Sequence, residues 1–168
     1  MTKVKHIYCY DFDKTFIRTA EKVEGKKKYH EVTGLTFPKE DWWQSPISLD
    51  MNIFYPTRNE FTYQEYKKSK AVPDAMNFLV TGRVLALKDH VIKILDFHDL
   101  KFDRYYLKDG NDTFIYKLNK FKSFLEEFPE LESLTIYDDR VDHLYKFKEW
   151  ADNEPRGQYV DIKIIEVS

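Results

Sequence analysis

Strand-like and helix-like segments alternate along most of this 168-residue chain. Short runs rich in β-branched and aromatic residues, typical of buried strands, are separated by longer runs with apolar residues at helical spacing. This alternation predicts a three-layer, Rossmann-like α/β fold, in which a mostly parallel five-stranded sheet is covered by helices on both faces. The expected strands are residues 4–10, 75–81, 102–107, 133–139 and 158–167, and the expected helices are residues 59–71, 84–97, 114–128 and 141–151.

Residues 16–58 interrupt the alternation directly after the first strand. They mix turn-forming residues, a lysine cluster and bulky aromatics, including Trp42 and Trp43, without a clean periodicity. We therefore expect an irregular, aromatic-rich insertion that forms a small cap beside the functional site. Since the sequence has no internal repeat and no second region of regular pattern, residues 1–168 are expected to form one domain around this insertion.

The charge balance and the single cysteine limit the classes of protein that fit. The chain has 27 Lys and Arg against 29 Asp and Glu, a net charge of −2, so a nucleic acid could be bound only by a local basic patch. The lone Cys9 excludes an internal disulfide and favours a reducing compartment. Because no apolar run approaches a membrane span and the first residues lack a signal-peptide pattern, we expect a cytoplasmic or nuclear protein without membrane contact.

Polar side chains stand at the ends of three expected strands. Asp11 and Asp13 follow the first, Thr81 ends the second, and Asp138 and Asp139 end the fourth. In α/β sheets, ligands bind beyond the carboxyl ends of the strands, near the switch in strand order. Two carboxylates at a separation of about 4 Å repel each other by roughly 4 kcal/mol at an effective dielectric of about 20, so such a group needs a cation. The all-oxygen ligand set predicts Mg²⁺, which shares its ligand shell with a phosphate.

These residue types can divide the work of phosphate transfer. Asp11, held against the metal, would attack phosphorus and form an aspartyl-phosphate. Asp13 would donate a proton to the leaving oxygen and later take one from water. The Thr81 hydroxyl and Lys117, near the start of its expected helix, would bind phosphate oxygens, together with the backbone N–H groups that follow Asp11 and Thr81.

Four motifs in order resemble the haloacid dehalogenase superfamily of phosphohydrolases. "DFDKT" at residues 11–15 resembles its DxDx(T/V) signature and "FLVTGR" at 78–83 its second motif, while Lys117 and "TIYDDR" at 135–140 take the places of the third and fourth. The wider set, with "WW..P" and "IYDDR..H", is similar to the haloacid dehalogenase domain of Swiss Army Knife RNA repair proteins. "DDR" also resembles the 3′-phosphatase domain of polynucleotide kinase-phosphatases. The resemblance spans roughly residues 5 to 150.

The resemblance implies a superfamily fold, Mg²⁺ as the cofactor and a role for each motif residue. Asp11 would be the nucleophile, and Asp13 the acid/base that also binds the metal through its backbone carbonyl. Asp138 or Asp139 would complete the metal site. The candidates for binding phosphate or substrate are Thr81, Lys117, Thr15, Gly82, Arg83 and Arg140.

The metal ligands of the fourth motif and the lysine of the third each have alternatives. The metal ligands are either the adjacent pair Asp138–Asp139, which we prefer because an arginine follows it, or Asp138 together with Asp142. Lys108 and Lys120 compete with Lys117 for the phosphate-binding position, and we prefer Lys117 because Lys108 directly follows its strand.

Other side chains have a structural interpretation beside a functional one. Arg83 and Arg140 either grip phosphates bidentately or form ordinary ion pairs. Trp42 and Trp43 either offer a stacking surface for a base or pack the insertion onto the sheet. His143 fits the narrower family pattern, and we expect it to have a supporting rather than a catalytic role.

The sequence therefore favours a Mg²⁺-dependent phosphomonoesterase that works through an aspartyl-phosphate. The family resemblance favours terminal 3′ phosphates of RNA or DNA as the substrate, whereas a small-molecule phosphatase would use the same residues. A phosphotransferase would do so as well. The alternative from another class is a non-catalytic module that binds phosphorylated ends, and the presence of both Asp11 and Asp13 disfavours it.

Overall fold

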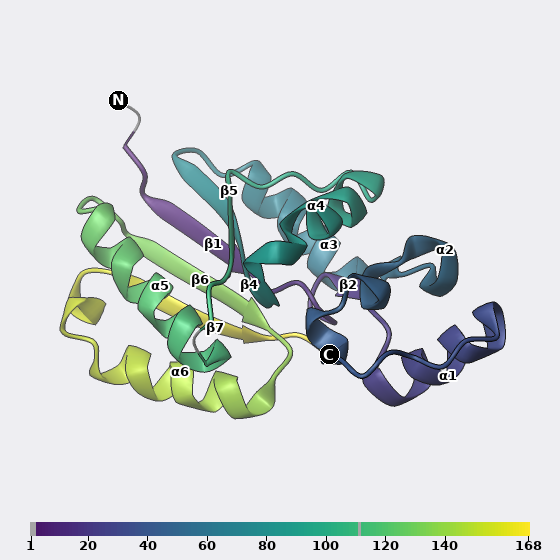
Figure 1. Ribbon diagram of the computed structural model, residues 1–168. Coiled ribbons are helices and arrows are strands. Elements are labelled where there is room, and N and C mark those ends of the chain that lie inside the picture. Colours follow the sequence, from purple (N-terminus) through teal and green to yellow (C-terminus); the bar gives the residue numbers. More distant parts are fainter. Residues whose placement is uncertain (1–2, 111) are drawn as a thin grey trace.

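A computed structural model describes residues 3–110 and 112–168, and a five-stranded parallel sheet lies at its centre (Figure 1). The strands are β1 (His6–Tyr10), β4 (Ala75–Val84), β5 (Arg104–Lys108), β6 (Ser133–Asp138) and β7 (Asp161–Glu166). Their order is β5-β4-β1-β6-β7, and every neighbouring pair is parallel. The chain thus builds outward from β1 on one side and then returns to its other side. The switch in strand order lies beside β1, where ligands are expected in such sheets.

Two pairs of helices cover the two faces of the sheet, as Figure 1 shows. They are α3 (Glu60–Lys70) with α4 (Lys88–Phe97), and α5 (Thr113–Glu127) with α6 (Val141–Asn153). Alternate residues of β4 divide between two cores: Leu79 packs in the core that contains Ile94 of α4, whereas Phe78 and Val80 pack in the core that contains Phe121 of α5. This is the two-residue period of a strand buried on both faces. The predicted three-layer α/β fold is confirmed.

None of the described helices combines the length and the apolar character that crossing a membrane requires.

The helix predicted at residues 59–71 begins as expected, because the Asn59 side chain accepts a hydrogen bond from the Thr62 N–H. The helix predicted at residues 114–128 is α5, and it ends before Pro129.

The second strand of the sheet is longer than predicted. β4 continues past Thr81 to Val84, and its register with β5 shifts between these two residues. The helix predicted from residue 84 therefore begins only at Lys88, after the 3₁₀ turn Leu85–Leu87. Apolar spacing alone did not locate this boundary, because Val84 still pairs with β5 in an extended conformation.

The insertion is more regular than predicted, and the expectation of an irregular segment was wrong. It contains α1 (Lys22–Thr33), α2 (Met51–Phe54), the 3₁₀ turns Trp42–Gln44 and Pro46–Leu49, and the antiparallel pair β2 (Ile17–Arg18) and β3 (Thr57–Arg58). α1 escaped prediction because Gly25 is its only buried residue. Without an apolar face, its sequence has no helical periodicity to detect.

Trp42 forms the centre of the insertion's own core. It is 1% exposed, its indole N–H donates to the Ala20 carbonyl at 3.2 Å, and the rings of Phe37 and Phe54 pack against it. Gly25 lets α1 approach this indole closely, because a Cβ at that position would lie 2.3 Å from Trp42 Cζ2. The contact between a glycine and a tryptophan therefore anchors the helix of the insertion.

We expect the substitution Gly25→Ala to destabilise the protein. Alanine is favoured over glycine in a helix by about 1 kcal/mol. Overpacking against a buried ring costs about 1–3 kcal/mol or more, and at a 2.3 Å approach the clash should outweigh the gain. Urea unfolding measures the effect, with Lys27→Ala on the exposed side of α1 as the control. A Gly25→Ala protein as stable as the control, or more stable, would contradict the contact.

Candidate active site

The carboxyl ends of β1 and β6 bring two buried aspartates side by side. Tyr10 is paired with Tyr137 in the parallel ladder, and the Asp11 N–H donates to the Tyr137 carbonyl at 3.1 Å, which continues the pairing by one residue. Asp11 therefore lies beside Asp138, which is 1% exposed at the end of β6. Two carboxylates from distant parts of the chain meet here because adjacent parallel strands end at the same edge.

The loop after β1 is a tight turn held by apolar side chains. Phe12 and Phe16 are fully buried, and the Phe12 carbonyl accepts hydrogen bonds from the N–H groups of Phe16 and Ile17, both at 3.0 Å. Lys14 adopts a left-handed conformation with φ of 62°. The buried Phe12 separates the two aspartates that line the cavity on either side of it.

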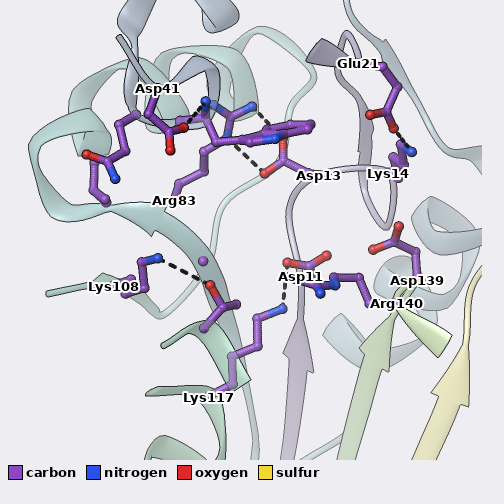
Figure 2. A pocket seen from close by; sticks show the side chains of 15 residues that line it. Asp11, Asp13, Lys14, Glu21, Asp41, Arg83, Lys108, Lys117, Asp139 and Arg140 are labelled. Carbon is purple, nitrogen blue, oxygen red and sulfur yellow. Dashed lines mark hydrogen bonds and ion pairs between the residues drawn. The ribbon is translucent and has the colours of Figure 1, made fainter. Parts of the chain in front are cut away.

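A cavity of about 470 Å³ opens at this edge of the sheet (Figure 2). Five acidic and five basic side chains line it, so its wall can accommodate both a cation and a phosphate anion. The lining residues are Asp11, Asp13, Lys14, Glu21, Asp41, Trp43, Gln44, Gly82, Arg83, Val84, Lys108, Thr113, Lys117, Asp139 and Arg140. The sequence did not single out six of these lining residues. Lys14 stands at the variable position of the first motif, and the other five carry no motif signal: Glu21, Asp41, Gln44, Val84 and Thr113.

Lys117 of α5 binds both buried aspartates. Its Nζ lies 2.9 Å from Asp11 Oδ1 and 2.6 Å from Asp138 Oδ2, and the residue is 2% exposed. Lys108 instead lies near the Thr113 hydroxyl at 3.4 Å, and Lys120 lies over aromatic rings of Tyr106 and Tyr116. The geometry therefore favours Lys117 among the three lysines that the sequence left open, although its role in phosphate binding stays a prediction.

Burial and mutual charge shape the ionisation of this cluster. Burial raises the pKa of Asp11 well above its usual range; the Lys117 ammonium opposes the rise, and the neighbouring carboxylates of Asp138 and Asp139 add to it. Burial also lowers the pKa of Lys117, but the charges of Asp11 and Asp138 outweigh it and raise the pKa above its ordinary value. Lys117 therefore stays protonated and supplies the charge that keeps its two carboxylate partners compensated.

Thr15 and Asp139 complete the cluster on the side opposite Lys117. The Thr15 hydroxyl lies 3.0 Å from Asp11 Oδ2 and 3.3 Å from Asp139 Oδ1, and a single hydroxyl proton can be donated to only one of them at a time. Burial raises the pKa of Asp139, the hydrogen bond with Asp11 opposes the rise, and the Asp138 charge adds to it. Thr15, predicted to bind phosphate or substrate, here holds carboxylates.

The residues present suit a divalent metal. Asp11, Asp138 and Asp139 each offer a carboxylate oxygen, and these atoms lie within 4.8 Å of one another. Oxygen-only donors around excess negative charge match the preference of Mg²⁺. Asp142, the alternative ligand, has a side chain that is 62% exposed and pairs with Arg140 at 3.0 Å. The arrangement therefore favours the adjacent aspartates of the fourth motif as ligands, and this assignment stays a prediction.

Asp13 lies in a different environment from Asp11. Its carboxylate accepts three hydrogen bonds from the Arg83 guanidinium at 2.7–3.2 Å and one from the Thr19 hydroxyl at 2.6 Å. The cluster of Asp11, Asp138 and Asp139 does not include the Asp13 side chain, which pairs with the Arg83 guanidinium instead. The two aspartates of the first motif thus have separate partners, as two different chemical roles require.

Arg83 connects the sheet to the insertion. Besides Asp13, its guanidinium donates to the Trp43 carbonyl at 2.9 Å and to the Ser48 hydroxyl at 2.7 Å, and Arg83 is 2% exposed. Of the two interpretations left open by the sequence, the ion pair describes this position, because most of its N–H groups already have protein acceptors. Arg140 is more available, since it lines the cavity with a side chain that is 50% exposed.

Thr81 and Gly82 lie where β4 loses its regular register. Thr81 is fully buried, and its hydroxyl accepts a hydrogen bond from the Arg83 N–H at 3.1 Å. Gly82 lines the cavity and packs closely on α5, because a Cβ there would lie 2.6 Å from Thr113 Cγ2. The close packing on Thr113 therefore explains why this position is a glycine, independently of its predicted contact with phosphate.

The remaining aromatic and histidine candidates separate by position. Trp42 packs the insertion, while Trp43 is half-buried and lines the cavity. His143 is buried beside Phe114 and Phe147, and burial with the charges of nearby cations lowers its pKa, so it is neutral. Among the described residues its Nδ1 has no hydrogen-bond partner.

Most of the chain matches a known family of domains. A family model described as "HAD domain family 1 in Swiss Army Knife RNA repair proteins" matches residues 32–168, most of the chain. The matched region begins after Asp11 and Asp13, so it includes the second, third and fourth motifs but not the first.

Two individual proteins are similar over most of the chain. An uncharacterized protein of Saccharomyces cerevisiae is 26% identical in an alignment that covers 86% of this chain and 36% of the relative, so the chain spans about a third of that protein's length. A haloacid dehalogenase-like family hydrolase from Streptococcus pneumoniae has a solved structure that covers 89% of this chain and 82% of its own, with 13% identity and a TM-score of 0.52. This last similarity is one of fold.

We expect Lys117→Met to lower the free energy of unfolding at neutral pH by about 3–5 kcal/mol, because it leaves buried carboxylates without their cation. Without the Lys117 ammonium, which opposes the effect of burial, the pKa of Asp11 would lie still further above that of the unfolded chain. Stability should then be present at low pH and lost as the pH rises through this raised pKa, so part of it returns in mild acid.

Urea unfolding at neutral and at mildly acidic pH tests this expectation. Lys122→Met, an exposed position on the same helix, is the matched control. A Lys117→Met protein that loses no more stability than Lys122→Met, or whose loss does not shrink in acid, would contradict the buried charge cluster.

Proposed function

Because this chain belongs to the haloacid dehalogenase domain family found in Swiss Army Knife RNA repair proteins, a family of hydrolase-type domains, we propose that it is a Mg²⁺-dependent phosphomonoesterase. It works through an aspartyl-phosphate and removes terminal 3′ phosphates from RNA or DNA. The observation that carries the proposal is the separation of the two aspartates of the first motif: Asp11 lies with Lys117 and the acidic cluster, whereas Asp13 lies with Arg83. One cavity contains both.

Asp11 is suited to act as the nucleophile. Its carboxylate is fixed by Lys117 on one oxygen and by Thr15 on the other, so its orientation does not have to be reached during the reaction. In the first step an Asp11 oxygen forms a bond to phosphorus while the bond from phosphorus to the leaving oxygen breaks. In the second step water attacks the same phosphorus, which releases phosphate and restores the Asp11 carboxylate.

We assign the proton transfer of both steps to Asp13. It would donate a proton to the leaving oxygen in the first step and take one from the attacking water in the second. Arg83 and Thr19 hold its carboxylate in one position at the cavity wall. The same residue can serve both steps because the leaving oxygen and the water occupy the same side of the phosphorus.

A bound Mg²⁺ would neutralise the phosphate oxygens and the developing charge of the transition state. Asp11, Asp138 and Asp139 would hold it. Lys117 and the metal would then together balance the negative charge of the carboxylates. Lys108 and Arg140 line other parts of the cavity, where their positive charge could bind the scissile phosphate or an adjacent phosphate of the substrate.

The preference for a nucleic-acid end is supported by the RNA repair proteins that define the family. The net charge of −2 fits a protein that binds one end rather than a long stretch of backbone, because end binding needs few phosphate contacts. Phosphorylated small molecules are the competing substrate class. The insertion favours them, because Asp41, Trp43 and Gln44 form part of the cavity wall and limit the size of a substrate.

We expect the Asp11→Asn protein to lose phosphate release by on the order of a thousandfold or more, since an amide cannot form the aspartyl-phosphate. Steady-state phosphate release with Mg²⁺ and a generic aryl phosphate measures it. Asp142→Asn is the matched control, because this carboxylate is exposed and outside the acidic cluster, and its rate should stay within about twofold of the wild type. Equal loss in both variants would contradict the assignment of the fourth motif.

We also expect chelation to abolish phosphate release and added Mg²⁺ to restore it. In the same assay, a 3′-phosphorylated oligonucleotide should be hydrolysed with a higher kcat/KM than a 5′-phosphorylated one or glycerol phosphate. Equal values for glycerol phosphate and the oligonucleotides would favour the small-molecule phosphatase. Activity that survives chelation would contradict the role given to the acidic cluster.

A further inference from the structure

The two adjacent tryptophans of the insertion point to different surroundings. Successive residues of a 3₁₀ turn project roughly 120° apart, and Trp42–Gln44 is such a turn. Trp42 enters the core of the insertion, whereas Trp43 is half-buried and lines the cavity that contains Asp11 and Asp13. The packing of the insertion therefore accounts for Trp42 and leaves the cavity position of Trp43 unexplained.

Trp43 is held in place through its backbone and through one contact of its ring. Its backbone N–H donates to Asp41 Oδ1 at 2.8 Å, and its carbonyl accepts from Arg83 Nη1 at 2.9 Å. The Arg83 guanidinium also lies 4.9 Å from the centre of the indole ring, a cation–π contact. Because the same guanidinium binds Asp13, the indole sits at a set position relative to that carboxylate.

The cavity has room for more than a phosphate. Its volume of about 470 Å³ is in the range that encloses an organic ligand rather than a lone anion. Beside the indole, the exposed side chains of Asp41 and Gln44 line the same wall. Asp41 keeps one carboxylate oxygen beyond the one that caps Trp43, and the Gln44 amide offers both a donor and an acceptor. A flat ring next to mixed hydrogen-bonding groups suits a nucleobase, which has an apolar face and a polar edge.

We infer that Trp43 is a stacking platform for the base of the nucleotide that carries the scissile phosphate, with Asp41 and Gln44 beside the polar edge of that base. The inference rests on the proposed function and narrows its substrate class to a nucleotide end, as opposed to a phosphorylated sugar or alcohol. Stacking is sequence-tolerant because every base has a π face. The terminal base would thus add affinity without imposing a sequence.

The test compares two 3′-phosphorylated oligonucleotides that differ only in the terminal residue, which bears a base in one and is abasic in the other. Affinity is measured with the Asp11→Asn protein in the presence of Mg²⁺, so that binding is read without turnover. We expect the base-bearing end to bind about tenfold to a hundredfold more tightly than the abasic end, the range of one stacked base. In the Trp43→Ala, Asp11→Asn double variant this ratio should fall to about one to twofold.

Two further variants separate stacking from a structural effect of Trp43. Trp43→Phe keeps an aromatic face and should retain much of the ratio, even if overall affinity falls. Tyr159→Ala removes an 80% exposed aromatic of another segment and should leave the ratio unchanged. The ratio is the informative quantity, because loosening Arg83 would weaken both oligonucleotides alike.

The outcomes distinguish this inference from the proposed function. The stacking platform would be overturned if the double variant kept the same ratio as the Asp11→Asn protein, or if the Asp11→Asn protein showed no preference for the base-bearing end. Neither result would bear on phosphatase activity. If the protein with Asp11 present releases no phosphate from any substrate, the proposed reaction fails, and the binding ratio still decides whether Trp43 stacks on a base.

Discussion

The buried ammonium group of Lys117 is the contact on which the site depends. It lies within 3 Å of carboxylate oxygens on both Asp11 and Asp138, and all three residues are almost inaccessible to solvent. Carboxylates so buried are unfavourable unless a cation pairs with them. The parallel pairing of β1 with β6 places two buried carboxylates next to each other at one edge of the sheet. Because α5 packs on the sheet, its Lys117 side chain lies between them and compensates their charge.

A second cation, Arg83, ties the insertion to the sheet. Arg83 lies in the part of β4 where the strand register shifts. Its guanidinium binds Asp13 in the loop after β1, and it also binds Trp43 and Ser48 in the insertion. The two aspartates of one motif thereby have different surroundings: Asp11 lies in a cluster of carboxylates with Lys117, and Asp13 lies against the Arg83 guanidinium.

The insertion contributes one part of the cavity wall. Its own core, centred on Trp42, is largely independent of the sheet, and the contact with Gly25 joins α1 to that core. Trp43, Asp41 and Gln44 then face the cavity from a short, well-anchored turn. Under the proposed function, the insertion would select the substrate and the sheet edge would carry the chemistry, a division common in α/β enzymes whose loops vary on a constant scaffold.

Local patterns were sufficient for the sheet, its covering helices and the motif residues. The strands and helices of the second half have strong periodicity, and Asp11, Asp13, Gly82, Arg83, Lys117 and Asp139 do line one cavity. α1 was missed because a helix with one buried residue has no apolar face to detect. The end of β4 was misplaced because an irregular strand pairing is not visible in apolar spacing.

The sequence by itself thus determined the α/β architecture and which acidic and basic residues would stand at strand ends, since both follow from local periodicity and from the topology of parallel sheets. Only the tertiary structure decided the partners: Lys117 rather than Lys108 for Asp11, Arg83 for Asp13, and Trp43 rather than Trp42 for the cavity. These choices depend on side chains that are far apart in the chain, and on the packing of helices and of the insertion against the sheet, which a one-dimensional pattern does not contain.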